Sequence, residues 1–201
     1  MRTIMTGMEW TSRWLARLGG VLILFAAVLI TLDVVWRSAF KSTAFESLEL
    51  SSYAVAIATT FGLAWALVSK AHVRIEVIYG MLGRRLQAGL DVLALAVLAL
   101  VAGVAAYWGG MVVAGNAQIG AVSNTTLAIP LVVPQGIWWL GIVWFAACAL
   151  VSCLLALVGV CRGRIDEVRA SFGPASVQDE VVDSTRGVLP PSAIAKTEGS
   201  C

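Results

Sequence analysis

The sequence predicts an all-α integral membrane protein with four transmembrane helices, both termini cytoplasmic, and an amphipathic cytoplasmic connector between helices 2 and 3. The composition, the spacing of the charged residues and the side on which they fall lead to this prediction. Hydrophobic residues make up 59% of the 201 residues and charged residues only 13%, whereas soluble domains carry about 25% charged residues. So few charges cannot cover a water-exposed surface, and we expect the lipid bilayer to be the solvent.

Long uncharged stretches place the first two spans. The 19 residues between Arg17 and Arg37 contain one charge, Asp33, and the 20 residues before Lys70 contain none. A bilayer core of about 30 Å needs about 20 helical residues at 1.5 Å each. Each stretch therefore holds one transmembrane helix.

The longest uncharged stretch covers the 70 residues between Asp91 and Arg162 and has room for two helices and a connector. Residues 116–134 are the expected connector, because they combine polar side chains with two prolines, which interrupt helices. The predicted spans lie near 15–36, 49–69, 92–115 and 136–160, within a membrane domain at 15–160 that follows a cytoplasmic N-terminus at 1–14 and precedes a disordered cytoplasmic tail at 161–201.

Basic residues near the spans fall almost entirely on one side of the membrane. Ten of the 14 Lys and Arg residues lie in the N-terminal segment, in the 70–91 segment and at the start of the tail, whereas the opposite side has only Arg37 and Lys41. Positive charge in short loops stays in the cytoplasm. Both termini are therefore expected to be cytoplasmic.

The segment 71–91 is predicted to lie along the cytoplasmic membrane surface. Apolar side chains recur in it at helical spacing, while basic side chains such as Arg84 and Arg85 fall mostly elsewhere, which is typical of a basic amphipathic helix. The single histidine, His72, lies in this segment. We expect His72 to be an interfacial residue rather than a metal ligand or a pH sensor.

Several classes of protein are excluded by residues that the sequence lacks. One histidine cannot supply two axial haem ligands or a multi-histidine metal site. The sequence contains no G-x-x-x-x-G-K-[ST] phosphate loop and no recognisable nucleophile with a base. We therefore expect no enzymatic activity, no cofactor and no metal site, and the net charge of +2 does not indicate a nucleic-acid partner.

Apart from Glu49 at the first position of the second span, Asp33 is the only carboxylate within a predicted span, and it has two interpretations. An acid inside a membrane suggests a carrier of protons or cations. However, Asp33 precedes Arg37 by four residues, which is the favourable order for a helical ion pair. The simpler interpretation is an interfacial ion pair at the end of helix 1.

Two further carboxylates, Glu46 and Glu49, precede or begin the second span. Acidic residues in the first turn suit the positive end of a helix dipole, and Ser47 is a possible N-cap. Solvated carboxylates at a helix start are the simpler interpretation. A salt link to a partner subunit is the alternative.

Small residues repeat along the second span in two rows. These rows are Ala54, Ala58, Gly62 and Ala66, and then Ala56, Thr60 and Ala64. Small side chains let helices approach closely in lipid. The rows either close the four-helix bundle itself or face a partner.

Four short patterns occur in order along residues 15–160. They are Arg37 followed by Phe40, Glu49-Leu50, the run His72-Val73-Arg74-Ile75-Glu76, and Thr126-Leu127-Ala128-Ile129-Pro130 followed by Pro134-Gln135-Gly136. Together they resemble the small membrane subunit (DctQ-like) of tripartite ATP-independent periplasmic (TRAP) transporters.

This resemblance implies an accessory role in uptake across the bacterial inner (cytoplasmic) membrane. The small subunit of such a transporter acts as a scaffold for a large multi-span permease subunit, which holds the substrate and ion sites. A periplasmic substrate-binding protein delivers an organic acid, and an ion gradient rather than ATP drives uptake. The candidate partner or interface residues are Asp33, Arg37, Glu46, Glu49, Ala54, Ala58, Gly62, Ala66, His72, Arg74, Glu76 and Pro130.

A different function remains open from the sequence. The chain would then be a self-sufficient, small homo-oligomeric transporter or channel that uses Asp33 as its ion site. The scarcity of other polar residues in the spans argues against this alternative.

Overall fold

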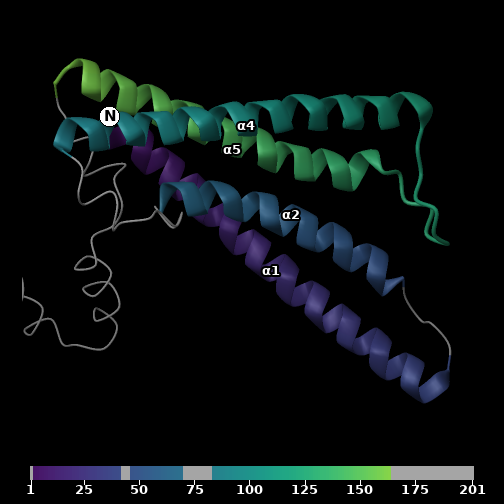
Figure 1. Cartoon of the computed structure of the whole chain (residues 1–201). Helices are drawn as coiled ribbons and strands as arrows, with labels where there is room; N and C mark the ends of the chain where they lie inside the picture. The colour runs from purple at the N-terminus through teal and green to yellow at the C-terminus, as the bar shows by residue number, and fades with distance from the viewer. Residues whose placement is uncertain (1, 42–45, 70–82, 164–201) are drawn as a thin grey trace, which may run out of the picture.

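Four helices form the part of the chain that the structure, a computed structural model, describes: residues 2–41, 46–69 and 83–163 (Figure 1). All four are long and apolar enough to cross a membrane, so the predicted all-α architecture with four spanning helices is confirmed. The helices are α1 (Arg2–Phe40), α2 (Ser47–Val68), α4 (Arg84–Ile119) and α5 (Val132–Cys161).

Most helices are longer than the predicted spans. The 39 residues of α1 correspond to about 58 Å at 1.5 Å per residue, well beyond the bilayer core. Helix α4 begins at Arg84, so residues 84–91 continue this helix and do not belong to a separate surface helix. Uncharged residues mark the part of a helix that lies in lipid, whereas backbone hydrogen bonds continue into its polar flanks.

The rest of the predicted amphipathic segment lies at residues 70–82, outside the described residues, together with His72, Arg74 and Glu76. The predicted tail from 164 onward lies outside them as well. The structure therefore leaves both predictions as they stand.

Neighbouring helices pack in the order α1, α2, α5, α4 (Figure 1). The two pairs α1–α2 and α4–α5 approach each other at the terminal end, which comprises the start of α1, the end of α2, the start of α4 and the end of α5. They diverge toward the connector end, which comprises the end of α1, the start of α2, residues 120–131 and the start of α5 (Figure 1). The main packing contact between the pairs is made by α2 and α5.

The core lies toward the terminal end. Ala64 of α2, Ala102 of α4, and Phe145 and Cys148 of α5 form one buried cluster, and Met8 of α1 packs against it. All four helices thus contribute to the core, and small residues make up much of it. Such residues bring helix backbones close together, which is how helices associate in lipid.

The two rows of small residues in α2 face different helices. A Cβ atom added to Gly19 of α1 would lie 3.0 Å from the carbonyl oxygen of Ala58, so the first row meets α1. A Cβ atom added to Gly141 of α5 would lie 2.5 Å from Oγ1 of Thr60, so the second row meets α5. Gly62 differs, because nothing lies within 4 Å of the position of its missing Cβ.

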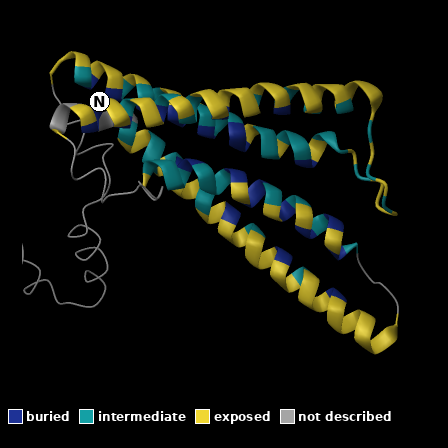
Figure 2. Ribbon diagram, in the orientation of Figure 1, coloured by how far each residue is buried: buried dark blue, intermediate teal, exposed yellow. Residues whose placement is uncertain are grey.

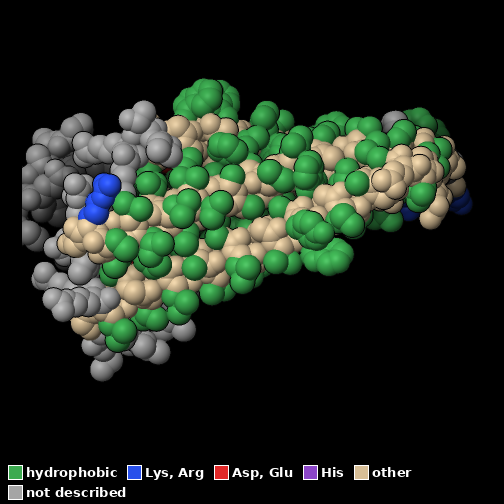
Figure 3. Space-filling view, turned by 90° about the horizontal axis from the view of Figure 1, so that it is seen from above, with side chains coloured by type: hydrophobic (Ala, Val, Ile, Leu, Met, Phe, Trp, Pro, Cys, Tyr) green, Lys and Arg blue, Asp and Glu red, His purple; other side chains and the backbone are tan. Residues whose placement is uncertain are grey.

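The outward faces of α1 and α4 remain uncovered in this chain (Figure 2). Large apolar side chains such as Leu24 and Phe25 of α1 and Leu100 and Val101 of α4 are more than half exposed. Figure 3 shows hydrophobic side chains along the length of the visible face, with Lys and Arg only near its two ends. This distribution suits a lipid environment.

Tryptophans of α4 and α5 differ in whether they pack between helices. Trp108 of α4 is 62% exposed. Trp139 of α5 packs on Gly110 and donates a 2.8 Å hydrogen bond to the carbonyl oxygen of Ala106. The glycine leaves space for the indole, which no pattern within α5 reveals.

Candidate interaction site at the connector end

The connector between α4 and α5 is a compact hairpin at residues 120–131, shorter than the 116–134 segment that the sequence predicts. Gly120 follows the last residue of α4 and has φ 61° and ψ 38°, a left-handed conformation that glycine adopts without steric cost. The amide of Ala121 donates to the carbonyl of Asn116 at 3.0 Å, as in a Schellman motif. Val122 and Pro130 then pair as an isolated antiparallel bridge.

Asp33 joins the end of α1 to the start of α2. Its Oδ2 accepts a 2.7 Å hydrogen bond from the Arg37 guanidinium and another of 2.7 Å from the hydroxyl of Ser47. Asp33 is 1% exposed, so the surrounding helices hold the carboxylate firmly. The structure thus contains the helical ion pair that the simpler interpretation of Asp33 predicts.

Ser47 differs from its predicted role as an N-cap. Helix α2 begins at Ser47, and Glu46 occupies the N-cap position without a side-chain capping bond. The Ser47 hydroxyl is directed toward Asp33 instead. A bond to a carboxylate is stronger than one to a neutral group, which favours this arrangement over capping.

Glu49 links α2 to the connector. Its carboxylate accepts a 2.7 Å hydrogen bond from the hydroxyl of Tyr53, one turn later in α2, and another from the hydroxyl of Thr125. The Ser123 hydroxyl lies 3.1 Å from that of Thr125 and extends the cluster. Glu49 is 8% exposed, so it is not the solvated carboxylate of the simpler interpretation.

A second link lies nearer the surface. The Thr126 hydroxyl donates to Oε1 of Glu46 at 2.8 Å. The two helices that flank the connector are also linked, because the side-chain amide of Asn116 in α4 donates to Oε1 of Gln135 in α5 at 2.7 Å. Glu46 and Glu49 therefore attach the connector to α2, while Asn116 and Gln135 join the two helices that flank it.

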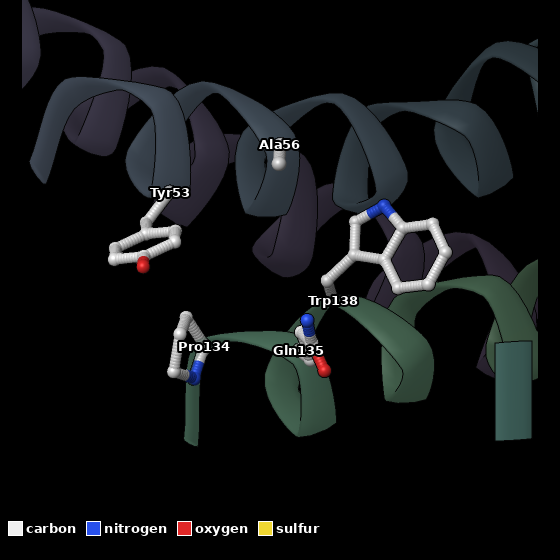
Figure 4. Close-up of a pocket in the computed structure, with 5 residues that line it drawn as sticks. All are labelled: Tyr53, Ala56, Pro134, Gln135 and Trp138. Atoms are coloured by element: carbon white, nitrogen blue, oxygen red, sulfur yellow. The ribbon is translucent and has the colours of Figure 1, made fainter. Parts of the chain in front are cut away.

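A small pocket of about 220 Å³ lies where the helix pairs diverge. Tyr53 and Ala56 of α2 line one side, and Pro134, Gln135 and Trp138 of α5 line the other (Figure 4). The tyrosine ring and the indole extend into the space between the two helices (Figure 4). The pocket shows that side-chain packing between α2 and α5 is incomplete at this end.

The structure brings together some of the predicted site residues and separates others. Asp33, Arg37, Glu46 and Glu49 lie at the connector end, and Pro130 lies in the hairpin that covers it. Ala54 and Ala58 are buried, whereas Gly62 and Ala66 are half-buried along α2 toward the terminal end.

Sequence reasoning missed the hydroxyl partners of the carboxylates. Thr125 and Thr126 lie 76 and 80 positions from Glu49 and Glu46, so no local spacing connects them. The available signal was the polar run of Ser123, Asn124, Thr125 and Thr126 inside a long uncharged stretch. Such a run needs hydrogen-bond partners near a membrane.

The described side chains at the connector end make structural links between elements. In the described ranges, no group of three or more His, Cys, Asp or Glu residues could hold a metal ion. Cys148, Cys153 and Cys161 are free thiols within or at the end of α5. The side chains at the connector end instead connect α1, α2 and the connector.

Comparison with protein families gives a match to a known family. Residues 26–159 match the family model of the DctQ component of tripartite ATP-independent periplasmic transporters. The match covers more than half of the chain and includes the end of α1, all of α2 and α4, the connector and nearly all of α5. Comparison with curated proteins and with solved structures finds no match.

Proposed function

The chain belongs to the DctQ family of TRAP transporter components, and from this premise we propose that it scaffolds a large permease subunit during uptake of an organic acid. Family membership supports the role of small permease subunit in a multi-pass membrane complex. The proposal places both termini in the cytoplasm and the connector end in the periplasm of a bacterial inner membrane. An ion gradient drives uptake, and a periplasmic binding protein delivers the substrate.

The distribution of buried polar groups favours the role of a scaffold over that of an ion carrier. Among the described residues, the buried carboxylates are Asp33 and Glu49 toward the connector end and Asp91 toward the terminal end. The other buried polar side chains of the described residues are uncharged, and that of Thr60 donates to the carbonyl of Ile57 in its own helix at 2.9 Å. They are Ser12, Ser47, Ser51, Thr60, Gln87 and Ser152. A path for an ion needs polar groups along its length, and this chain leaves that task to the large subunit.

The exposed apolar faces supply area for that subunit. Monomeric soluble proteins rarely expose contiguous apolar patches beyond a few hundred Å², and the faces of α1 and α4 expose large side chains along most of their lengths. Lipid covers part of this surface in the proposed complex. The large permease covers the rest and is held by helix packing, as within the chain itself.

The connector end is the proposed docking surface for the periplasmic binding protein. Arg37 is 58% exposed in its side chain although it pairs with Asp33, and Lys41 is exposed at the end of α1. The rings of Trp36 and Phe40 pack together there with centroids 4.4 Å apart, and both are accessible. Cations beside aromatic rings suit an acidic protein surface.

Copurification with the large subunit tests the scaffold proposal. In mild detergent, the chain is expected to elute with a co-expressed large permease subunit. Gly62→Leu should weaken this association, because the position is half-buried and has open space around it within the chain. Gly19→Leu is the matched control for internal packing, since its added atoms meet Ala58 and should impair folding first.

A chain that purifies alone and transports substrate alone in liposomes would contradict the proposal. The substitution Asp33→Asn also distinguishes the scaffold role from that of a self-sufficient transporter. In the scaffold role, the amide oxygen that this substitution introduces can still accept the hydrogen bond from Ser47, and the complex should retain ion-coupled uptake. In a self-sufficient transporter that uses Asp33 as its ion site, the same substitution abolishes transport in a correctly folded protein.

A further inference from the structure

The first turns of α1 carry exposed tryptophans and arginines on one face. Trp10 is 65% exposed and Trp14 is 48% exposed, and their rings meet edge-to-face with centroids 6.3 Å apart. Arg13 and Arg17 are exposed beside them. The four residues occupy neighbouring helical positions three or four residues apart, so they form one continuous surface, here called the Arg–Trp patch.

Both guanidinium groups of the Arg–Trp patch lie over indole rings. The guanidinium of Arg17 is 5.2 Å from the ring centroid of Trp14, and that of Arg13 is 5.2 Å from the ring centroid of Trp65 in α2. Stacking uses the face of a guanidinium and leaves its N–H groups, which lie at the edge, available to an anion. The Arg–Trp patch on α1 is therefore supported by Trp65 of the neighbouring helix α2.

These positive charges are not neutralised by neighbouring carboxylates in the described part of the chain. The ion pair of Arg37 with Asp33 lies at the opposite end of α1. Glu9 lies one turn before Arg13 and is half-buried, yet it forms no ion pair with it. The patch thus presents two cations in a fixed orientation.

An apolar stripe continues from the patch into the membrane. Leu18, Val21, Phe25 and Val28 follow Trp14 at alternating steps of four and three residues, and each is more than half exposed. The stripe from Leu18 to Val28 is about 15 Å long at 1.5 Å per residue, or about half of the 30 Å bilayer core. Its length therefore matches the acyl chains of one leaflet.

We propose that the Arg–Trp patch binds an anionic phospholipid. The Arg13 and Arg17 guanidinium groups hold the phosphate, Trp10 and Trp14 lie at the level of the headgroup, and the acyl chains follow the stripe that begins at Leu18. Arginine recognises phosphate through paired N–H donors, and tryptophan favours the membrane interface. The leaflet is the cytoplasmic one if the orientation given under the proposed function is correct.

Lipid preference measured on the full-length protein tests this site. The protein is reconstituted in vesicles of phosphatidylcholine that contain a small fraction of brominated phosphatidylglycerol, and quenching of tryptophan fluorescence reports binding. Wild-type protein should prefer phosphatidylglycerol over phosphatidylcholine, and Arg13→Gln or Arg17→Gln should each lower this preference about fivefold. Trp10→Phe combined with Trp14→Phe should remove most of the quenching that is specific to phosphatidylglycerol.

Arg162→Gln is the matched control, because Arg162 is an exposed arginine at the same end of the membrane domain but on the end of α5. An equal loss of preference in this variant would show a general surface-charge effect and would overturn the proposal. A wild-type protein without preference would also overturn it. If the Arg13 and Arg17 variants instead lose the large permease, the patch is a subunit contact and the lipid proposal is wrong, whereas the scaffold proposal stands.

Discussion

At the terminal end, the helices converge on small and apolar side chains, whereas at the connector end the two helix pairs diverge and hydrogen bonds connect them. The cluster around Ala64 and Cys148 represents the first region. The bonds from Thr125 and Thr126 to Glu49 and Glu46 represent the second. The difference shows that one membrane domain uses both close packing and hydrogen bonds between side chains, the two interactions that hold helices together in lipid.

The division has a physical reason. Inside the hydrocarbon core, a carboxylate is costly, so close packing of alanines and glycines must hold the helices. Near the membrane surface, water lowers that cost and the backbone leaves helical geometry. Side chains can therefore form hydrogen bonds between the two diverging helix pairs. Glu46, Glu49 and their hydroxyl partners thus occupy the end where packing between α2 and α5 is incomplete, near the pocket of Figure 4.

The contact between Gly141 and Thr60 separates these two regions, and disrupting it should have the largest effect. A Cβ atom at position 141 would lie 2.8 Å from Cβ of Thr60 and 3.0 Å from Cδ1 of Phe61. We expect Gly141→Leu to lower the free energy of unfolding by about 3 kcal/mol through overpacking. Titration of micelles with sodium dodecyl sulfate, followed by circular dichroism, measures this loss.

Gly136→Leu in the same helix provides the comparison. Nothing lies within 4 Å of the position of its missing Cβ, so its unfolding free energy should change little. Equal losses in the two variants would show that leucine disturbs α5 itself and that the α2–α5 approach is not the cause.

Trp139 tests the packing of the α4–α5 pair. Trp139→Phe removes the indole N–H that donates to the carbonyl of Ala106, and we expect a loss of about 1 kcal/mol in the free energy of unfolding. Trp108→Phe should have almost no effect, because Trp108 is largely exposed. If the Trp108 variant is the less stable of the two, the packing of the two indoles has been assigned incorrectly.

The smallest effect is expected at the connector and should remain local. Thr125→Val removes the hydroxyl that donates to Glu49, so amides of the hairpin at 120–131 should exchange hydrogen about tenfold faster. Hydrogen exchange with mass spectrometry resolves this segment from the helices. Thr59→Val is the control, because that exposed hydroxyl donates only within α2, to the carbonyl of Val55.

Unchanged exchange in the Thr125 variant would mean that backbone bonds alone hold the hairpin. The amide of Ser123 donates to the carbonyl of Ile129 at 2.9 Å, and that of Leu131 donates to the carbonyl of Ala121 at 3.0 Å. Thr126→Val should have a weaker effect than Thr125→Val, since its bond to Glu46 is exposed.

Much of the fold could be predicted, because helices in lipid satisfy their own backbone and leave long uncharged runs. The ion pair of Asp33 with Arg37 was also accessible, since four residues separate them on one helix. The helix that each row of small residues in α2 contacts could not be predicted. Ala58 and Thr60 lie two positions apart in α2, yet they meet α1 and α5 respectively.

The sequence by itself determined the four spanning helices, the positions of their charges and the resemblance to the DctQ component. These features depend on composition and on spacing within single helices. Only the tertiary structure decided which helices pack together, which tryptophan lies in a contact, and which hydroxyls bind Glu46 and Glu49. Those choices depend on residues that lie dozens of positions apart, where the helix period gives no information about which side chains meet.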